Sequence, residues 1–189
     1  MIKIGIVGDI GSGKSYVAKM FGYPVFNADY EVSKLYKKDK KIFKKLKIKL
    51  PKHIHSFPVN KNEICKAILE NKTNLKKIVD IVHLAIRKKM KLFLKKNINK
   101  KIVILDIPLL MENKINKNGD ILIFIQSKKT EVLKRLKKRQ NFNLKLFNRF
   151  KKIQLPLEYK KRKSTYIIKN NFTKNSVKVC VKNILKKIL

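Results

Sequence analysis

The chain has few of the residues that mark a secreted, metal-binding or membrane-spanning protein. Its 189 residues include only two cysteines, Cys65 and Cys180, and these lack the spacing of a metal or redox motif. Lone cysteines of this kind are typical of a reducing, cytoplasmic compartment. No apolar run reaches the ~18 residues that a membrane helix needs. The run Ile4–Val7 is too short for the apolar core of a secretory signal, so we expect a cytoplasmic protein with no membrane partner.

Acidic residues are scarce as well. There are 12 of them against 49 lysines and arginines, which gives a formal net charge of +37. A chain this basic could bind nucleic acid or an anionic membrane. However, its lysines are spread from one end to the other without a single basic tract, which indicates a compositional bias. We therefore expect no nucleic-acid partner, and we expect the charge to attract small polyanions in a salt-sensitive way.

Arginine is rare even among the basic residues, since lysine supplies 44 of the 49. The arginines are Arg87, Arg135, Arg139, Arg149 and Arg162. A chain that uses lysine almost everywhere is expected to keep arginine where its planar fork is needed. Three of the five fall between residues 135 and 149. Chance clustering is the alternative interpretation of so small a number.

A complete phosphate-binding motif lies near the start of the chain. Residues 8–15 read G-D-I-G-S-G-K-S and fit G-x-x-x-x-G-K-[ST], directly after the apolar run Ile2–Val7. Glycines let the backbone wrap around phosphates, and the helix that follows adds its N-terminal N–H groups and its dipole. The motif predicts that Lys14 reaches the β- and γ-phosphates and that the Ser15 hydroxyl holds Mg²⁺. A glycine-rich turn that arose by chance is the alternative.

Short apolar segments alternate with helical patterns, which predicts an α/β fold with one five-stranded parallel sheet. The expected strands are Ile2–Val7, Val25–Phe26, Ile102–Leu105, Ile121–Ile125 and Tyr166–Ile168. The expected helices follow the phosphate loop and cover 30–50, two pieces between 64 and 85 broken near 71–74, 130–139, 144–153 and 177–189. The stretch 30–100 holds only helix and loop, so we interpret it as a helical insertion in a single domain.

Two aspartates follow expected strands, at the edge where parallel sheets bind ligands. Asp29 is a candidate general base for an acceptor hydroxyl, as kinases use aspartate, and its alternative is the N-cap of a helix beginning at Tyr30. Asp106 resembles an acid that helps to hold Mg²⁺, and its alternative is a turn residue before Pro108.

Arginine and histidine side chains complete the candidates. Arg135 and Arg139 are four residues apart, which would place them on one helix face. With Arg149 they could clamp a phosphoryl group, or they could form a solvated basic surface. His83 lies in an otherwise apolar helical pattern, which is more typical of a hydrogen-bonded core histidine. His53 and His55 form an H-x-H pair without a third ligand nearby and are interpreted as loop residues.

Over nearly its whole length the chain resembles the dephospho-coenzyme A kinases, a family of P-loop kinases. The phosphate loop is similar to that family's G-G-I-G-S-G-K-S. Residues 25–29, V-F-N-A-D, resemble its V-I-D-A-D, and residues 59–64, V-N-K-N-E-I, resemble a segment with L-D-R-x-x-L. His83 keeps the spacing of the family's H-P dipeptide from the segment around residue 68.

The second half of the chain continues the resemblance. Residues 108–112, P-L-L-M-E, are similar to P-L-L-F-E, the most family-specific of these motifs. The three clustered arginines and the Q-L-P at 154–156 resemble the family's lid, R-x-x-x-R followed by R-I-x-x-Q-x-P. Residues 166–170, Y-I-I-K-N, resemble its closing V-I-D-N strand.

The resemblance implies transfer of the γ-phosphoryl group of ATP to the ribose 3′-hydroxyl of dephospho-coenzyme A, with Mg²⁺, as the last step of coenzyme A synthesis. It implies a nucleotide-binding core at 1–29, 101–126 and 164–189, a helical substrate subdomain at 30–100 and a small lid at 127–163. A monomer is expected.

Site residues are carried over by their positions in these motifs. The implied catalytic residues are Asp29 as the base, Lys14 and Arg139. The implied ATP-binding residues are Gly11, Ser12, Gly13, Lys14, Ser15, Tyr16, Arg139 and Arg149. The implied acceptor-binding residues are Asp29, Lys61, His83, Glu112 and Arg135. The implied metal ligands are Ser15 and Asp106.

The chain departs from the family pattern at several positions, none of which removes Lys14, Ser15, Asp29 or Glu112. The departures are Asp9 for glycine, Tyr16 for threonine, Asn27 for aspartate, Lys61 for arginine, Leu84 for proline and Lys169 for an acid. They affect the expected efficiency and coenzyme recognition more than the reaction class.

Two other functions remain open from the residues alone. One is a kinase for another small acceptor, such as a nucleoside or a nucleotide. The other is a nucleotide-dependent switch or a nucleic-acid-stimulated ATPase. A guanine-reading N-K-x-D motif is absent, since residues 116–119 read N-K-N-G.

Overall fold

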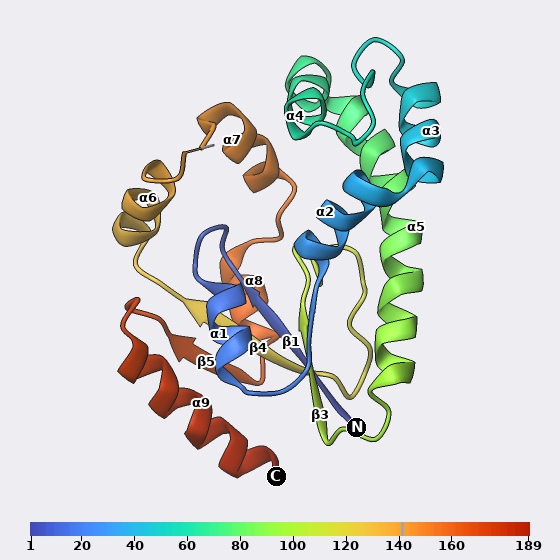
Figure 1. The fold of residues 1–189 in the computed structure, drawn as a ribbon. Coiled ribbons are helices and arrows are strands. Elements are labelled where there is room, and N and C mark those ends of the chain that lie inside the picture. The colour runs from blue at the N-terminus through green and yellow to red at the C-terminus, as the bar shows by residue number, and fades with distance from the viewer. Residues whose placement is uncertain (141) are drawn as a thin grey trace. The chain divides into compact units, whose positions relative to one another are not determined.

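A computed structural model describes residues 1–140 and 142–189. Within these residues, five parallel strands form one sheet in the order β2-β3-β1-β4-β5 (Figure 1). The strands are β1 Ile2–Gly8, β2 Val25–Asn27, β3 Ile102–Asp106, β4 Ile121–Gln126 and β5 Tyr166–Lys169. The predicted α/β fold with a five-stranded parallel sheet is confirmed.

The sheet is buried on both sides, as expected for parallel strands that read as continuous apolar runs. All five residues of β3 are buried. On one face, Ile4 and Ile6 of β1 join a core with the buried sides of α1 (Lys14–Met20) and α9 (Lys174–Ile188). Gly5 faces the other way, where a Cβ would meet Leu110 and Leu122. The short helix α8 (Leu157–Arg162) also packs against β1.

The described part of the chain separates into two compact units. Unit 1 contains Met1–Asn27, Asn97–Asn143 and Arg149–Leu189, and therefore the whole sheet. Unit 2 contains Ala28–Lys96 and Leu144–Asn148. The helix α6 (Lys129–Lys137) belongs to unit 1, and α7 (Leu144–Lys152) is divided between the units. The boundaries of the core, the substrate subdomain and the lid, as functional parts, stay predictions.

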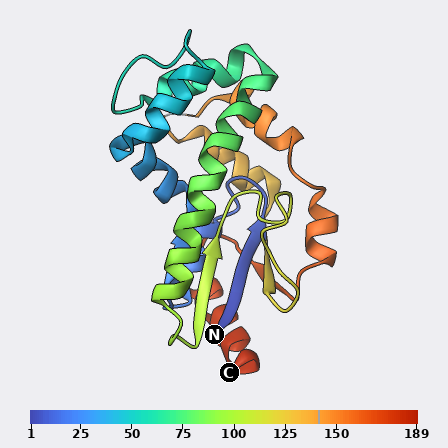
Figure 2. The same ribbon diagram turned by 90° about the vertical axis from the view of Figure 1, so that its right-hand side faces the viewer.

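Unit 2 is helical. Its helices are α2 Ala28–Lys38, α3 Lys40–Lys49, α4 Lys61–Glu70 and α5 Lys72–Lys96. The first three pack against the long α5 (Figure 2). Glu31 of α2 pairs with Lys89 of α5 at 3.1 Å. The break expected near 71–74 lies between α4 and α5, at Asn71.

Two helical predictions need correction. The pattern over 30–50 is two helices, because the Asp39 side chain caps α3 by accepting from the Ile42 N–H at 3.0 Å. The helix expected over 130–139 ends at Lys137, so Arg139 lies beyond it and does not share a continuous helix face with Arg135. Among the described residues, no helix has both the length and the apolar character that crossing a bilayer requires.

Candidate active site

The phosphate loop joins β1 to α1 and depends on left-handed glycines. Gly11 has φ +82°, and a Cβ there would lie 2.9 Å from the Leu136 side chain. Gly13 has φ +90°, and a Cβ there would overlap the amide nitrogen of Asn170. The motif's glycines are therefore required both by backbone conformation and by close packing against neighbouring segments.

Residues that directly follow β4 and β5 form hydrogen bonds with the backbone of the phosphate loop. The Ser12 carbonyl accepts hydrogen bonds from Ser127 Oγ at 3.0 Å and from Asn170 Nδ2 at 2.8 Å. Asn170 is itself buried, and its backbone N–H donates to the Gln126 carbonyl at 2.8 Å. Sequence reasoning assigned no role to Ser127 or Asn170. The signal that could have found them is their place directly after strands, at the same sheet edge as the phosphate loop.

Inside the loop, the Ser12 hydroxyl is fully buried and has no hydrogen-bond partner among the residues that the structure describes. Buried hydroxyls are normally paired, so each exception needs an explanation. A bound anion that completes the loop's polar groups is such an explanation, because the loop's N–H groups are anion donors as well. The loop therefore fits a phosphate-bearing ligand.

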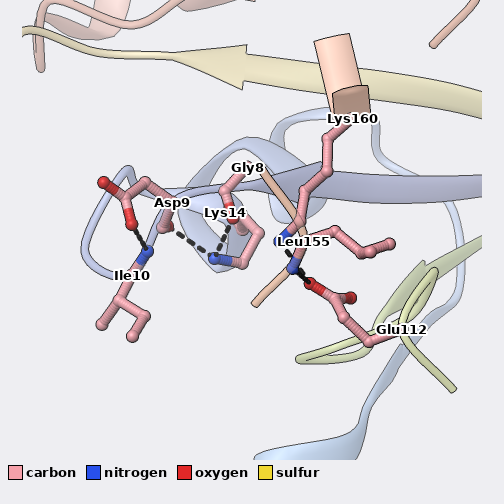
Figure 3. Close-up of polar contacts among 7 residues, drawn as sticks. All are labelled: Gly8, Asp9, Ile10, Lys14, Glu112, Leu155 and Lys160. Carbon is pink, nitrogen blue, oxygen red and sulfur yellow. Dashed lines mark hydrogen bonds and ion pairs between the residues drawn. The ribbon is translucent and has the colours of Figure 1, made fainter. Parts of the chain in front are cut away.

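Lys14 and Asp9 occupy the two ends of the loop (Figure 3). The Lys14 ammonium donates to the carbonyls of Gly8 at 3.2 Å and Asp9 at 2.7 Å. The Asp9 carboxylate accepts from the Ile10 N–H at 2.7 Å, on the side away from the Lys14 ammonium. The acid that departs from the family pattern thus bonds the loop's own backbone.

The two candidate acids, Asp106 and Asp29, differ in their surroundings. Asp106 is buried at the end of β3 and accepts a hydrogen bond from the side-chain amide of Asn27, its register partner on β2. Asp29 is exposed and lies in the first turn of α2, which begins at Ala28. Asp29 is therefore not the N-cap of a helix beginning at Tyr30. Ser15 and Tyr16 are exposed near the start of α1.

The arginines after β4 are exposed or half-buried. The Arg135 guanidinium lies over the Phe172 ring, 4.4 Å from its centroid, at the end of α6. Phe172 follows β5 and has φ +65°. Arg139 follows the end of α6, and Arg149 lies in α7.

Glu112 is linked to the segment that follows α7. Its Oε1 lies 2.6 Å from the Lys160 ammonium and accepts a hydrogen bond from the Leu155 N–H at 3.0 Å (Figure 3). A small pocket brings this group together with the phosphate loop. It is lined by Ile6, Val7, Gly8, Lys14, Ile107, Leu109, Leu110, Glu112, Gln154 and Lys160. Sequence reasoning did not identify Lys160.

Two implied acceptor-binding residues lie in unit 2. Lys61 is exposed at the first position of α4, beside its N-cap Asn60. His83 is half-buried on α5, and burial lowers its pKa, as does Arg87 nearby, while Asp80 raises it. The histidine pair of the predicted loop has protein partners, since His53 lies 3.1 Å from Glu70.

This fold and site define a P-loop kinase: a phosphate loop after the first strand of a five-stranded parallel sheet, with arginines after the fourth strand. Two solved structures share the fold. A crystal structure of a Thermus thermophilus protein superposes with a TM-score of 0.80 at 24% identity, covering 100% of this chain and 98% of that one. Dephospho-CoA kinase from Campylobacter jejuni gives a TM-score of 0.65 at 21% identity, covering 98% and 96%.

Sequence comparison identifies the family. The family model described as dephospho-CoA kinase matches residues 2–175. The dephospho-CoA kinase of Wolbachia sp. subsp. Brugia malayi is 34% identical over 187 residues, which cover 96% of this chain and 95% of that protein. The chain belongs to the dephospho-CoA kinase family. It is therefore a kinase with ATP as its co-substrate, as predicted.

Proposed function

We propose that the chain transfers the γ-phosphoryl group of ATP to the ribose 3′-hydroxyl of dephospho-coenzyme A, giving coenzyme A and ADP. One observation carries the proposal. The pocket beside the phosphate loop is lined both by Gly8 and Lys14 and by Glu112 of the P-L-L-M-E segment. In a chain of the dephospho-CoA kinase family, this places the motif that binds phosphate next to the motif most typical of that family.

ATP binding is assigned to the phosphate loop and the arginines after β4. The backbone of Gly11, Ser12 and Gly13 surrounds the phosphates, and the buried Ser12 hydroxyl supports this because it has no protein partner among the described residues. Lys14 exchanges its bonds to the Gly8 and Asp9 carbonyls for the β- and γ-phosphates. Ser15 and Tyr16 contribute from the first turn of α1.

Ser15 and Asp106 are assigned to Mg²⁺. Their donors are oxygens, which this hard cation prefers, and it usually keeps several waters. The ion's chemistry would be to neutralise charge on the phosphates. Asn27 holds the buried Asp106 carboxylate at the end of β3, so this residue is already oriented to act through water. Ser15 offers its hydroxyl at the start of α1.

Asp29 is assigned as the general base. It lies two residues after Asn27, the last residue of β2, so its Cα is within about 7 Å of the Asn27 Cα. The carboxyl edge of the sheet, where β2 ends, also carries the phosphate loop after β1. An exposed carboxylate at this position can accept the proton of the acceptor hydroxyl during transfer.

The remaining assignments rest on the motif positions. Arg139 and Arg149 neutralise charge on the transferring phosphoryl group, since a guanidinium forms two parallel bonds to phosphate oxygens. The acceptor is bound by Lys61, His83, Glu112 and Arg135. We expect the enzyme to act as a monomer in the cytoplasm, without a nucleic-acid or membrane partner.

The test is ADP release with ATP, Mg²⁺ and dephospho-coenzyme A, beside adenosine, AMP and no acceptor. Release only with dephospho-coenzyme A, together with a new phosphomonoester coupled to the ribose H3′ in ³¹P NMR, is the expected result. Lys14→Ala should abolish turnover, whereas Lys19→Met, an exposed lysine of the same helix, should not. Release with another acceptor, or a product phosphorylated elsewhere, would refute the proposal.

A further inference from the structure

Among the residues that the structure describes, Lys160 is the single buried lysine, with 2% of its surface exposed. It lies on α8, and its ammonium forms an ion pair with Glu112 Oε1 at 2.6 Å. Glu112 is also nearly buried, with 10% of its side chain exposed. In a chain with 44 lysines, placing this one inside the protein is an exception to the pattern of a solvated basic surface.

A buried ion pair of this kind is poorly explained by stability alone. The desolvation of both charges offsets much of their attraction, and apolar residues of similar volume are often as stabilising or more so. Breaking such a pair by removing one partner, by contrast, leaves a buried charge without compensation. The pair is therefore better explained by what it positions.

The pair joins two segments beside the phosphate loop. Glu112 ends the P-L-L-M-E segment after β3, and its Oε1 also accepts from the Leu155 N–H, just before α8. Both charged residues line the pocket that contains Gly8 and Lys14. Figure 3 shows the Lys160 side chain extending from α8 to Glu112, close to the phosphate loop.

Both contacts fall on one oxygen of the carboxylate, Oε1. A carboxylate has two oxygens and about four acceptor sites, so this pairing fixes its plane and leaves Oε2 outside these two contacts. A flexible glutamate would have to be ordered by the substrate, at a cost in affinity. Lys160 and the Leu155 N–H order it beforehand.

We propose that Lys160 is a positioning residue for the transfer reaction: by holding Glu112 Oε1, it orients the carboxylate that meets the acceptor beside the phosphate loop. The inference rests on the proposed acceptor-binding role of Glu112. Lys160 itself contacts neither substrate in this account. Its removal should therefore affect the acceptor and leave nucleotide binding nearly intact.

The test uses the full-length enzyme and four variants: Lys160→Met, Glu112→Gln, the apolar double variant Glu112→Leu/Lys160→Met, and Lys163→Met. Lys163 is an exposed lysine at the end of the same helix and serves as the matched control. Measurements are kcat and KM for each substrate, binding of a non-hydrolysable ATP analogue, and the thermal unfolding midpoint. The wild-type enzyme with dephospho-coenzyme A is measured in the same series.

Lys160→Met should lower kcat/KM for the acceptor by roughly 10²-fold, the typical cost of a misplaced reacting group, mainly by raising its KM. The affinity for the ATP analogue should change less than about threefold, and Lys163→Met should match the wild type. Removing Glu112 in addition to Lys160 should lower kcat/KM for the acceptor little further, because the two residues act as a unit.

The apolar double variant separates positioning from stability. Because it buries no charge, it should recover the unfolding midpoint even if Lys160→Met folds poorly. If it also recovers acceptor kcat/KM, the pair is only structural and the proposal is wrong. An equal loss of ATP and acceptor affinity in Lys160→Met would overturn it too. A wild-type enzyme inactive on dephospho-coenzyme A would instead refute the proposed function.

Discussion

The side-chain amide of Asn27 donates a hydrogen bond to the carboxylate of Asp106, which joins the ends of β2 and β3. The family pattern has an aspartate at the position of Asn27. In this chain an amide therefore stands where a second acid would lie beside the buried Asp106. An amide donor satisfies Asp106 without a metal ion or a shared proton. This contact therefore allows a direct test of the metal site assigned to Asp106.

Asn27→Asp should lower the free energy of unfolding by about 1–3 kcal/mol in EDTA, because it removes a donor to a buried carboxylate and adds a like charge. Millimolar Mg²⁺ should restore part of this loss, since a cation held at Asp106 would compensate the added charge. Chemical unfolding with and without Mg²⁺ measures both effects.

Asn27→Leu is the matched control for this experiment. It removes the same hydrogen bond without adding a charge, so Mg²⁺ should stabilise it less than it stabilises Asn27→Asp. If Mg²⁺ stabilises Asn27→Asp no more than Asn27→Leu, the assignment of Asp106 to the metal site is wrong.

Gly13→Ala should destabilise the protein and weaken ATP binding, and Gly22→Ala provides its control. Both glycines have positive φ, +90° and +72°, which costs an alanine about 1–2 kcal/mol in either place. Gly22 has open space around a Cβ, whereas a Cβ on Gly13 would displace the Asn170 amide from the Ser12 carbonyl.

The difference between these two variants isolates the packing of the phosphate loop. Denaturant unfolding should place Gly13→Ala at least about 1 kcal/mol below Gly22→Ala, from the lost hydrogen bond and steric strain. Isothermal titration with an ATP analogue should show a loss of affinity for Gly13→Ala alone. Equal stability and affinity in the two variants would mean that Asn170 does not support the loop.

Local sequence patterns predicted the sheet and the phosphate loop, because both depend on short-range features. An apolar run defines each strand, and the eight residues of the loop specify its conformation through Gly11 and Gly13. The family resemblance added expected roles for the acids and arginines only through motif matches. Topology explains why Asp106 and the phosphate loop lie at the same edge of the sheet, and it is the reason that Asp29, two residues after β2, is expected there.

Contacts between segments distant in sequence were not predictable in the same way. Lys160 looks like one more lysine in a basic stretch, and only the folded chain brings it to Glu112. The support of Ser12 by Asn170 has the same origin. The end of α6 at Lys137 is a local event, but nothing in a run of lysines and arginines signals it, so the helix was extended too far.

Asp29→Asn should lower kcat by about 10²–10⁴, the usual contribution of a general base, while ATP affinity stays unchanged. The substitution keeps the size of the side chain and removes its ability to accept a proton. Steady-state kinetics with dephospho-coenzyme A, beside titration with an ATP analogue, measure the two effects separately. Glu158→Gln, which removes an exposed acid from α8, should behave like the wild type. Unchanged turnover in Asp29→Asn would refute the assignment.

His83 should make the folded state less stable as the pH falls through the range near 6.5. Burial, with a contribution from Arg87, lowers the pKa of His83 below the ordinary value of 6.5, although Asp80 opposes the shift. The unfolded state therefore binds the proton more readily, so this contribution to the free energy of unfolding is fully present above pH 6.5 and declines as the pH falls below it.

Urea unfolding at pH 7.5 and pH 5.5 should show a smaller decline in the free energy of unfolding for His83→Gln than for the wild type. His53, which lies 3.1 Å from Glu70, is present in both proteins, so its contribution cancels in this comparison. Equal declines would show that His83 has the same proton affinity folded and unfolded, and would remove the case for a neutral histidine on α5.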